Sequence, residues 1–188
     1  ICGRIVQVGE GVEPKCIGSR VIVRSMQNSP NSNNPFAMQT VGSEIDGGFA
    51  QYCVTLAKEA YPVNCNWSDI ELASIPISYS TAEGMLCRAN IKNEKILITG
   101  ASGGVGSAAI QLAKIRGASI IAQCSSHKAS DLKALGANHT VNRDDDLLKV
   151  LGKNSVDAVL DLVGGSCWPQ LLDILKPGGK YIVLSLIH

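Results

Sequence analysis

Residues 95–106 read KILITGASGGVG, an apolar run followed by four glycines within seven positions. The run predicts a buried strand, and the apolar residues from Val105 to Arg116 recur at helical spacing. Glycines between a strand and a helix allow a tight turn and a close approach of the backbone to a pyrophosphate, which the helix N-terminus favours. Residues 100–106 therefore predict a dinucleotide-binding loop, with a strand–helix turn that binds nothing as the alternative.

Apolar strands alternate with helices from this loop to the end of the chain. After the first strand we expect further strands at residues 119–122, 140–141, 157–162 and 180–186, each preceded by a helix. Such alternation predicts an α/β fold, a Rossmann-type parallel sheet with helices on both faces.

The N-terminal part of the chain has a different pattern. Short runs rich in β-branched residues predict strands at residues 4–8 and 19–23, and residues 47–54 predict a further turn and strand. The polar stretch 27–44 predicts a long loop. Ser68 and Glu71 form a capping box that opens a short helix, and a separate helix is expected at 79–89, after Pro76.

Composition excludes several classes of protein. Apolar residues make up 45% and charged residues 18%, which excludes a disordered chain. The net charge of +1 predicts neither a nucleic-acid partner nor a membrane surface. The seven cysteines contain no CxxC pair, which favours reduced thiols in a cytoplasmic protein and gives no sign of a structural zinc site.

The end of the second strand of the predicted sheet indicates which dinucleotide is bound. Proteins of this fold that bind NAD carry an Asp or Glu there, on the ribose hydroxyls. Residues 123–128 hold no carboxylate; Ser125, Ser126 and Lys128 offer two hydroxyls and a cation, which suit the 2′-phosphate of NADP(H). The alternative for Lys128 is a solvated residue at a helix start.

Further stretches together resemble the medium-chain dehydrogenase/reductase superfamily, in its quinone-oxidoreductase-like and alcohol-dehydrogenase-like branch. The resemblance runs the whole length of the chain. Besides the glycine loop, it rests on residues 3–12, 18–21, 47–52, 80–83 and 176–179. It implies part of a GroES-like β-barrel domain at 1–76 and a Rossmann NADP-binding domain at 77–188.

The resemblance also implies a fragment truncated at both ends. The family's sheet has six strands in the order 3-2-1-4-5-6, of which the chain supplies five. The missing strand would leave residues 181–187 as an apolar edge, so we expect the fragment itself to have little activity. The parent protein is expected to be a homodimer.

Site residues follow from the same resemblance. Thr81 matches a catalytic threonine beside the nicotinamide ring, although a hydroxyl near a helix start can also be a cap. The other implied cofactor contacts are Gly100, Ser102, Gly103, Gly104, Val105 and Gly106 at the pyrophosphate, Ser125, Ser126 and Lys128 at the 2′-phosphate, Val163 and Gly164 at the adenosine, and Leu184 and Ser185 at the carboxamide.

Zinc is not expected. Zinc-dependent members place a ligand four residues before that threonine, where this chain has Ile77, and carry four cysteines in the region of residues 27–44, where it has none. Without a Lewis acid, hydrogen-bond donors would polarise the substrate carbonyl.

These observations favour an NADP(H)-dependent oxidoreductase that moves a hydride between nicotinamide and a small carbonyl, quinone or enone. A short-chain dehydrogenase is an alternative, although none of the four tyrosines has a lysine four positions later. A non-enzymatic dinucleotide-binding protein on the same fold stays open, because a fold does not fix a function.

Overall fold

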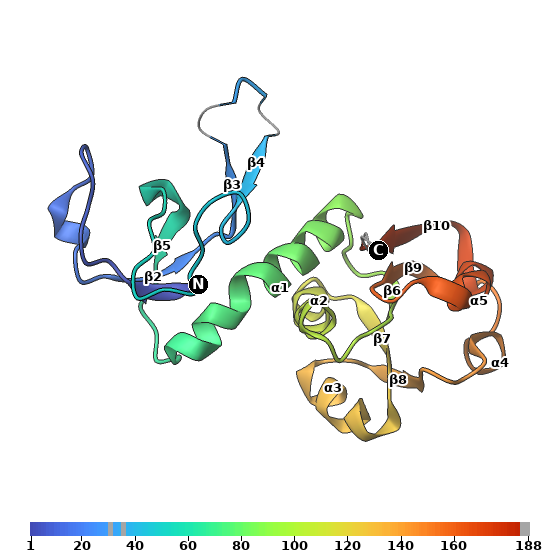
Figure 1. The fold of residues 1–188 in the computed structure, drawn as a ribbon. Helices are drawn as coiled ribbons and strands as arrows, with labels where there is room; N and C mark the ends of the chain where they lie inside the picture. The colour runs from blue at the N-terminus through green and yellow to red at the C-terminus, as the bar shows by residue number, and fades with distance from the viewer. Residues whose placement is uncertain (30–31, 35–36, 185–188) are drawn as a thin grey trace. The chain divides into compact units, whose positions relative to one another are not determined.

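The computed structural model describes residues 1–29, 32–34 and 37–184. They form two compact units, Ile1–Ile77 and Ser78–His188, and helix α1 (Asp69–Arg88) runs from the first unit into the second (Figure 1). Within the described ranges, no helix has both the length and the hydrophobicity of a membrane span.

A five-stranded parallel sheet forms the second unit, in the order β10-β9-β6-β7-β8 (Figure 1). The strands are β6 (Lys95–Ile98), β7 (Ser119–Cys124), β8 (His139–Asn142), β9 (Val156–Asp161) and β10 (Leu175–Val183). The sheet and its order confirm the predicted Rossmann-type fold. Because the chain leaves β6 on one side for β7 and returns to its other side for β9, the strand order reverses at β6, which is where sheets of this kind bind ligands.

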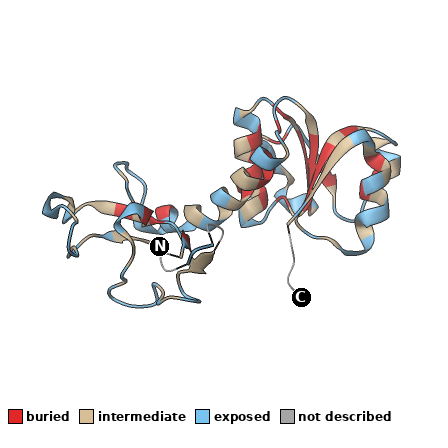
Figure 2. Ribbon diagram, turned by 90° about the horizontal axis from the view of Figure 1, so that it is seen from above, coloured by how far each residue is buried: buried red, intermediate tan, exposed pale blue. Residues whose placement is uncertain are grey.

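Helices cover both faces of this sheet, as the apolar strands require. Ile96 and Ile98 of β6 pack with α1, α2 (Gly104–Ile115) and α3 (Ala129–Leu135), whereas Leu97 packs with α4 (Leu147–Leu151) and α5 (Trp168–Ile174). The central strands are accordingly the most buried part of the second unit (Figure 2). Successive residues of a strand point to opposite faces, so an unbroken apolar run is needed to fill two cores.

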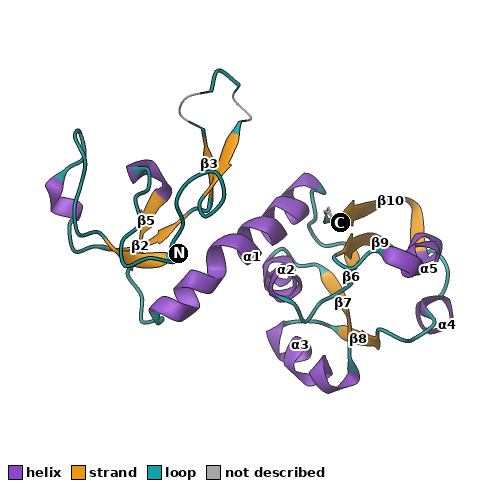
Figure 3. Ribbon diagram, viewed as in Figure 1, coloured by secondary structure: helices purple, strands orange, loops and turns teal. Residues whose placement is uncertain are grey.

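The first unit consists of short antiparallel strands (Figure 3). A three-stranded sheet has the order β1-β2-β5, and a separate hairpin pairs β3 with β4. The strands are β1 (Cys2–Arg4), β2 (Arg20–Val23), β3 (Met26–Asn28), β4 (Met38–Thr40) and β5 (Ala60–Pro62), with 3-10 turns η1 (Pro14–Cys16) and η2 (Ala57–Glu59). The strand predicted at 4–8 is therefore wrong, because β1 ends at Arg4 and residues 5–8 belong to no strand.

The strands of this hairpin occupy residues 26–28 and 38–40, so the prediction of one continuous loop at 27–44 was wrong. Gln27 of β3 is fully buried, and its amide donates to the Arg24 carbonyl at 2.9 Å and to Thr55 Oγ1 at 2.8 Å. Backbone pairing and the two hydrogen bonds from the Gln27 amide nitrogen hold a strand that lacks an apolar pattern, while the buried Gln27 side-chain oxygen has no hydrogen-bond partner among the residues that the structure describes.

The strand predicted at 47–54 is also wrong. This described segment is irregular, and none of the sheets of the described structure includes it. Phe49, Tyr52 and Val54 are exposed. A segment with strand-forming residues such as Phe49 and Tyr52 forms a strand only when another strand pairs with its backbone.

Helix α1 is longer than predicted and includes Pro76. The capping box is confirmed: the Ser68 N–H donates to Glu71 Oε2 at 2.7 Å, and the Glu71 N–H to Ser68 Oγ at 3.3 Å. Proline removes one N–H but has a helical φ, so a single proline interrupts the hydrogen-bond pattern without ending the helix. The separate helix predicted at 79–89 is the second half of α1.

Candidate functional site

The glycine loop, residues 100–106, connects the C-terminal end of β6 to the start of α2. The Gly103 N–H donates to the Gly100 carbonyl at 3.0 Å, which closes the turn. Gly103 is the N-cap of α2, and no side chain caps the helix there. The first N–H groups of a helix lack intrahelical acceptors, so this exposed end of α2 can bind an anion.

Backbone geometry requires two of the loop's glycines, Gly100 and Gly106, and a third, Gly104, lies close to a side chain. Gly100 has a φ of 55°, which disfavours a side chain. A Cβ on Gly106 would lie 2.5 Å from the Gly100 oxygen and 2.6 Å from Ala101 Cα. A Cβ on Gly104 would lie 2.7 Å from Ser78 Oγ, which places the α1 hydroxyl of Ser78 against the loop.

Gly106→Ala is expected to lower the free energy of unfolding by about 2 kcal/mol, because the new methyl meets backbone atoms that cannot turn aside. Urea denaturation measures the change. Gly84→Ala in α1 is the control: nothing lies within 4 Å of its Cβ position, and alanine favours helix, so no loss is expected. A Gly106→Ala protein as stable as the wild type would contradict the packing described for the loop.

The end of β7 lies beside the glycine loop, because the Ala101 N–H donates to the Gln123 carbonyl at 3.2 Å. Ser125 follows β7 directly, and Ser126–Lys128 forms the 3-10 turn η3 before α3. Ser126 and Lys128 are exposed. The structure therefore gathers the three residues predicted for the 2′-phosphate at one edge, next to the glycine loop.

The end of β8 adds two residues that the sequence analysis missed. The Arg143 N–H donates to the Cys124 carbonyl at 3.1 Å, and Asn142 Nδ2 donates to Ser126 Oγ at 2.6 Å. The Arg143 side chain is exposed, and its Nε lies 3.7 Å from Asp144 Oδ2, a weak surface pair. The parallel pairing of β8 with β7 could have revealed Arg143, because it places the residue after β8 beside the end of β7.

The segment after β9, residues 162–164, touches the glycine loop from the other side. Val163 Cγ2 lies 3.0 Å from the position that a Cβ on Gly100 would take. Val163 is exposed and Gly164 partly buried. The ends of β6 and β9 therefore meet at the switch point, where Val163 and Gly164 were predicted.

The remaining predicted residues lie as follows. Thr81 is partly buried inside α1, one turn after Ser78, so it is not a helix-start residue and capping does not explain its hydroxyl. The Leu184 N–H donates to the Asp161 carbonyl at 3.0 Å, which places Leu184 beside the end of β9. Ser185 lies outside the described residues.

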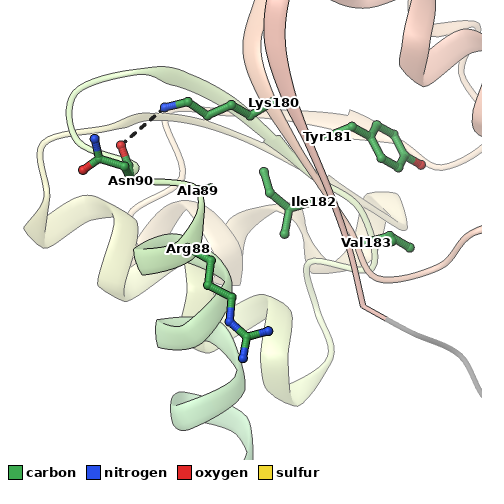
Figure 4. A pocket seen from close by; sticks show the side chains of 7 residues that line it. All are labelled: Arg88, Ala89, Asn90, Lys180, Tyr181, Ile182 and Val183. Atoms are coloured by element: carbon green, nitrogen blue, oxygen red, sulfur yellow. Dashed lines mark hydrogen bonds between the residues drawn. The ribbon is translucent and has the colours of Figure 1, made fainter.

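A separate pocket of about 570 Å³ lies between the C-terminal end of α1 and the edge strand β10 (Figure 4). Its lysine, Lys180, donates to the Asn90 carbonyl at 3.5 Å and pairs with Glu94 Oε1 at 3.3 Å. None of the predicted site residues lines this pocket.

Within residues 1–29, 32–34 and 37–184, no three His, Cys, Asp or Glu side chains gather in a way that could hold a metal ion. Ile77, at the position where zinc-dependent members carry a ligand, has an aliphatic side chain. The described residues therefore do not fit a bound zinc, and the expectation of a zinc-free protein stays a prediction.

Comparison with known proteins identifies the family. The family model of a zinc-binding dehydrogenase matches residues 104–188. A solved structure from Sinorhizobium meliloti 1021, assigned to the alcohol dehydrogenases, is 40% identical with a TM-score of 0.88, over 97% of this chain and 52% of that one. The chain belongs to the medium-chain dehydrogenase/reductase superfamily.

Other relatives of this medium-chain dehydrogenase/reductase chain carry different names. A quinone oxidoreductase from Coxiella burnetii is 31% identical with a TM-score of 0.81, over 99% of this chain and 54% of that one. Acryloyl-coenzyme A reductase from Metallosphaera sedula is 28% identical, over 98% of this chain and 58% of the relative. The chain thus spans between half and three-fifths of the length of these proteins.

Proposed function

We propose that the protein containing this chain is an NADP(H)-dependent oxidoreductase that transfers a hydride between the nicotinamide and a small carbonyl, quinone or enone. The observation that carries the proposal is the edge formed by the ends of β7 and β8. There Ser125, Ser126, Lys128 and Arg143 lie beside a glycine loop at a helix start, and residues 123–128 hold no carboxylate.

The glycine loop fits the pyrophosphate. A side chain at position 106 would meet backbone atoms and one at position 104 would meet the Ser78 hydroxyl, so in this chain the backbone itself forms the surface of the turn. Uncapped N–H groups and the positive end of the α2 dipole then face the anion.

The choice of NADP(H) over NAD(H) rests on charge. A 2′-phosphate adds negative charge, which the Lys128 ammonium and the Arg143 guanidinium would attract and the two serine hydroxyls would bind by donation. Arg143 has only a weak partner in Asp144, so little is lost when it turns to a phosphate.

The nicotinamide would supply or accept the hydride when bound, and this chain would orient it. Thr81 carries a hydroxyl on the α1 face that Ser78 presents to the glycine loop, and Leu184 follows β10 beside the end of β9. We assign Thr81 to the nicotinamide ring and Leu184 with Ser185 to its carboxamide.

The substrate class rests on the relatives' names, which include an alcohol dehydrogenase, a quinone oxidoreductase and an acryloyl-coenzyme A reductase. These names refer to an alcohol, a quinone and acryloyl-coenzyme A, whose acryloyl group is a double bond conjugated to a carbonyl. With Ile77 at the zinc-ligand position, we assign polarisation of the substrate oxygen to hydrogen-bond donors. A homodimer of the parent protein belongs to the same proposal.

Calorimetric titration of this chain with NADPH and with NADH tests the proposal. We expect NADPH to bind at least about tenfold more tightly, which corresponds to about 1.4 kcal/mol. Equal affinities, or tighter binding of NADH, would reject the NADP(H) assignment.

A dinucleotide-binding protein without catalytic activity is the second candidate, favoured only by the shared fold. NADPH oxidation followed at 340 nm, with a quinone and an enal, separates the two candidates. Turnover in a protein that carries this chain supports the enzyme, and tight binding without turnover supports the binding protein.

A further inference from the structure

A fully buried carboxylate, Asp161, ends β9 at the switch point. Its Oδ1 accepts three hydrogen bonds: from Thr99 Oγ1 at 2.7 Å, from the Val163 N–H at 3.1 Å and from the Gly164 N–H at 3.0 Å. Thr99 Oγ1 in turn accepts the Leu162 N–H at 2.9 Å. Three successive amides, residues 162–164, are therefore held by the Thr99–Asp161 pair.

The other carboxylate oxygen of Asp161 faces two aromatic side chains. Oδ2 accepts from Trp168 Nε1 at 3.1 Å and from the Tyr181 hydroxyl at 2.5 Å. The two rings pack edge to face, with centroids 6.3 Å apart, and Tyr181 lies on the opposite side of β10 from Ile182 (Figure 4). The Asp161 carboxylate thus connects β6, β9, α5 and β10.

The charge of Asp161 is maintained despite burial. Burial alone would raise its pKa, but hydrogen bonds from the Gly164 N–H, the Tyr181 hydroxyl and the Thr99 hydroxyl outweigh that effect and lower the pKa below its ordinary value. An ionised carboxylate only accepts hydrogen bonds, so the Thr99 hydroxyl must donate to it. The lone pairs of Thr99 Oγ1 are then left for the Leu162 N–H, which fixes the direction of every bond in the set.

Thr99 connects the hydrogen bonds of Asp161 to the glycine loop. Thr99 directly precedes Gly100, the first residue of the glycine loop, and Val163 packs against Gly100. One hydroxyl therefore joins the start of the glycine loop to the segment that follows β9. Neither Thr99 nor Asp161 is exposed, so neither can touch a ligand.

We propose that the Thr99–Asp161 pair is a positioning pair for dinucleotide binding, which holds residues 162–164 against the glycine loop before the ligand arrives. The inference rests on the proposed function, because it assumes that a dinucleotide binds between these two loops. A site held in its binding geometry loses less conformational entropy on binding, so the pair should raise affinity without any direct contact.

Three variants of the full chain separate this role from ordinary stability. Thr99→Val keeps the side-chain shape but removes the hydroxyl, and Thr99→Ser restores the hydroxyl without the methyl. Ile174→Val is the matched control: Ile174 is fully buried at the end of α5, next to the pairing of Leu175 with Val156 at the start of β9, away from the glycine loop.

The readouts are the NADPH dissociation constant by calorimetry, the urea midpoint, and amide hydrogen exchange of residues 162–164 without dinucleotide. We expect Thr99→Val to weaken NADPH binding about tenfold and to speed exchange at the three amides. The substitution removes both hydrogen bonds of the Thr99 hydroxyl, the one donated to Asp161 and the one accepted from the Leu162 N–H. Thr99→Ser and Ile174→Val should stay within about twofold of the wild-type affinity.

Two results would overturn the inference: Thr99→Val binding NADPH as tightly as the wild type, or Ile174→Val losing as much affinity as Thr99→Val at a similar midpoint. A wild-type chain that binds neither NADPH nor NADH would instead reject the proposed function, and the dinucleotide role of the pair with it. The exchange measurement then still decides whether Thr99 holds the three amides.

Discussion

Replacing Lys128 and Arg143 together by alanine is expected to weaken NADPH binding about a hundredfold and to leave NADH binding within about twofold. Hydrogen bonds to charged groups contribute roughly 1.5–3 kcal/mol each, and exposure places these two at the lower end of that range. Only NADPH has the 2′-phosphate that both cations would contact, so the loss should be specific to it. Titration calorimetry of both dinucleotides measures the effect.

A control for this experiment removes the same charge elsewhere. Lys133 and Lys153 are exposed in the same unit, on α3 and before β9, and the double variant Lys133→Ala/Lys153→Ala should bind NADPH as the wild type does. Higher salt should weaken NADPH binding more than NADH binding in the wild type. An equal loss for both dinucleotides in the Lys128/Arg143 variant would show that these cations do not recognise the 2′-phosphate.

The sequence indicated Lys128 as a ligand of the 2′-phosphate, but it did not indicate Arg143. Lys128 follows the second strand of the predicted sheet within a few residues, so the chain itself places it near the glycine loop. Arg143 follows a strand that the sequence predicted as only residues 140–141, whereas β8 spans His139–Asn142. Its proximity depends on the pairing of β8 with β7, which brings Asn142 beside Cys124.

The second unit was predictable because its strands are apolar on both faces. Leu97 and Ile98 each fill a different core, so the run stands out from its polar flanks without any knowledge of its neighbours. Glycine at 136 ends α3 with a φ of 131°, a conformation that sequence rules anticipate at a helix end.

The first unit was less predictable because its strands are short and their pairing is not encoded in hydropathy. Gln27 is buried, and its amide nitrogen donates to the Arg24 carbonyl and to Thr55, a partner 28 residues away. Pro76 indicated a helix boundary, but α1 continues through it. At Gln27 a tertiary contact decided the structure against the local pattern, whereas at Pro76 the helical φ of proline lets the helix continue.

The Asp161 cluster could not be assembled from the sequence either. Thr99 is 62 residues from Asp161, and Tyr181 is 20 residues away on another strand. An aspartate at the end of an apolar strand is visible in the sequence, but its five donors are visible only in the folded chain.

Asp161→Ala is therefore expected to be the most damaging single substitution for stability, lowering the free energy of unfolding by about 3–5 kcal/mol. Its donors, which include one indole, one phenol and two backbone amides, would lose the buried carboxylate that accepts from them. Urea denaturation at pH 7 measures the change. Asp144→Ala, which removes an exposed carboxylate, should stay within about 0.5 kcal/mol of the wild type.

The pH dependence of that difference tests whether the charge of Asp161 is responsible. The pKa of Asp161 is lowered in the folded chain, mainly because donated hydrogen bonds outweigh burial, so its stabilisation is present above the ordinary aspartate pKa of about 3.9 and is lost as pH falls through the folded value. Acid destabilises other paired carboxylates, such as Asp157, in both proteins alike. The gap between wild type and Asp161→Ala should therefore narrow below about pH 4. A difference in stability that stays constant from pH 7 to pH 3 would mean that a neutral carboxyl serves equally well, and the charge of Asp161 would then have no part in holding the loop.

Tyr181 makes the stability depend on pH at the alkaline end. Burial and the hydrogen bond to Asp161 raise the pKa of Tyr181, so its contribution to stability is lost as pH rises above about 10. In Asp161→Ala the phenolate absorbance of Tyr181 should therefore appear at lower pH than in the wild type.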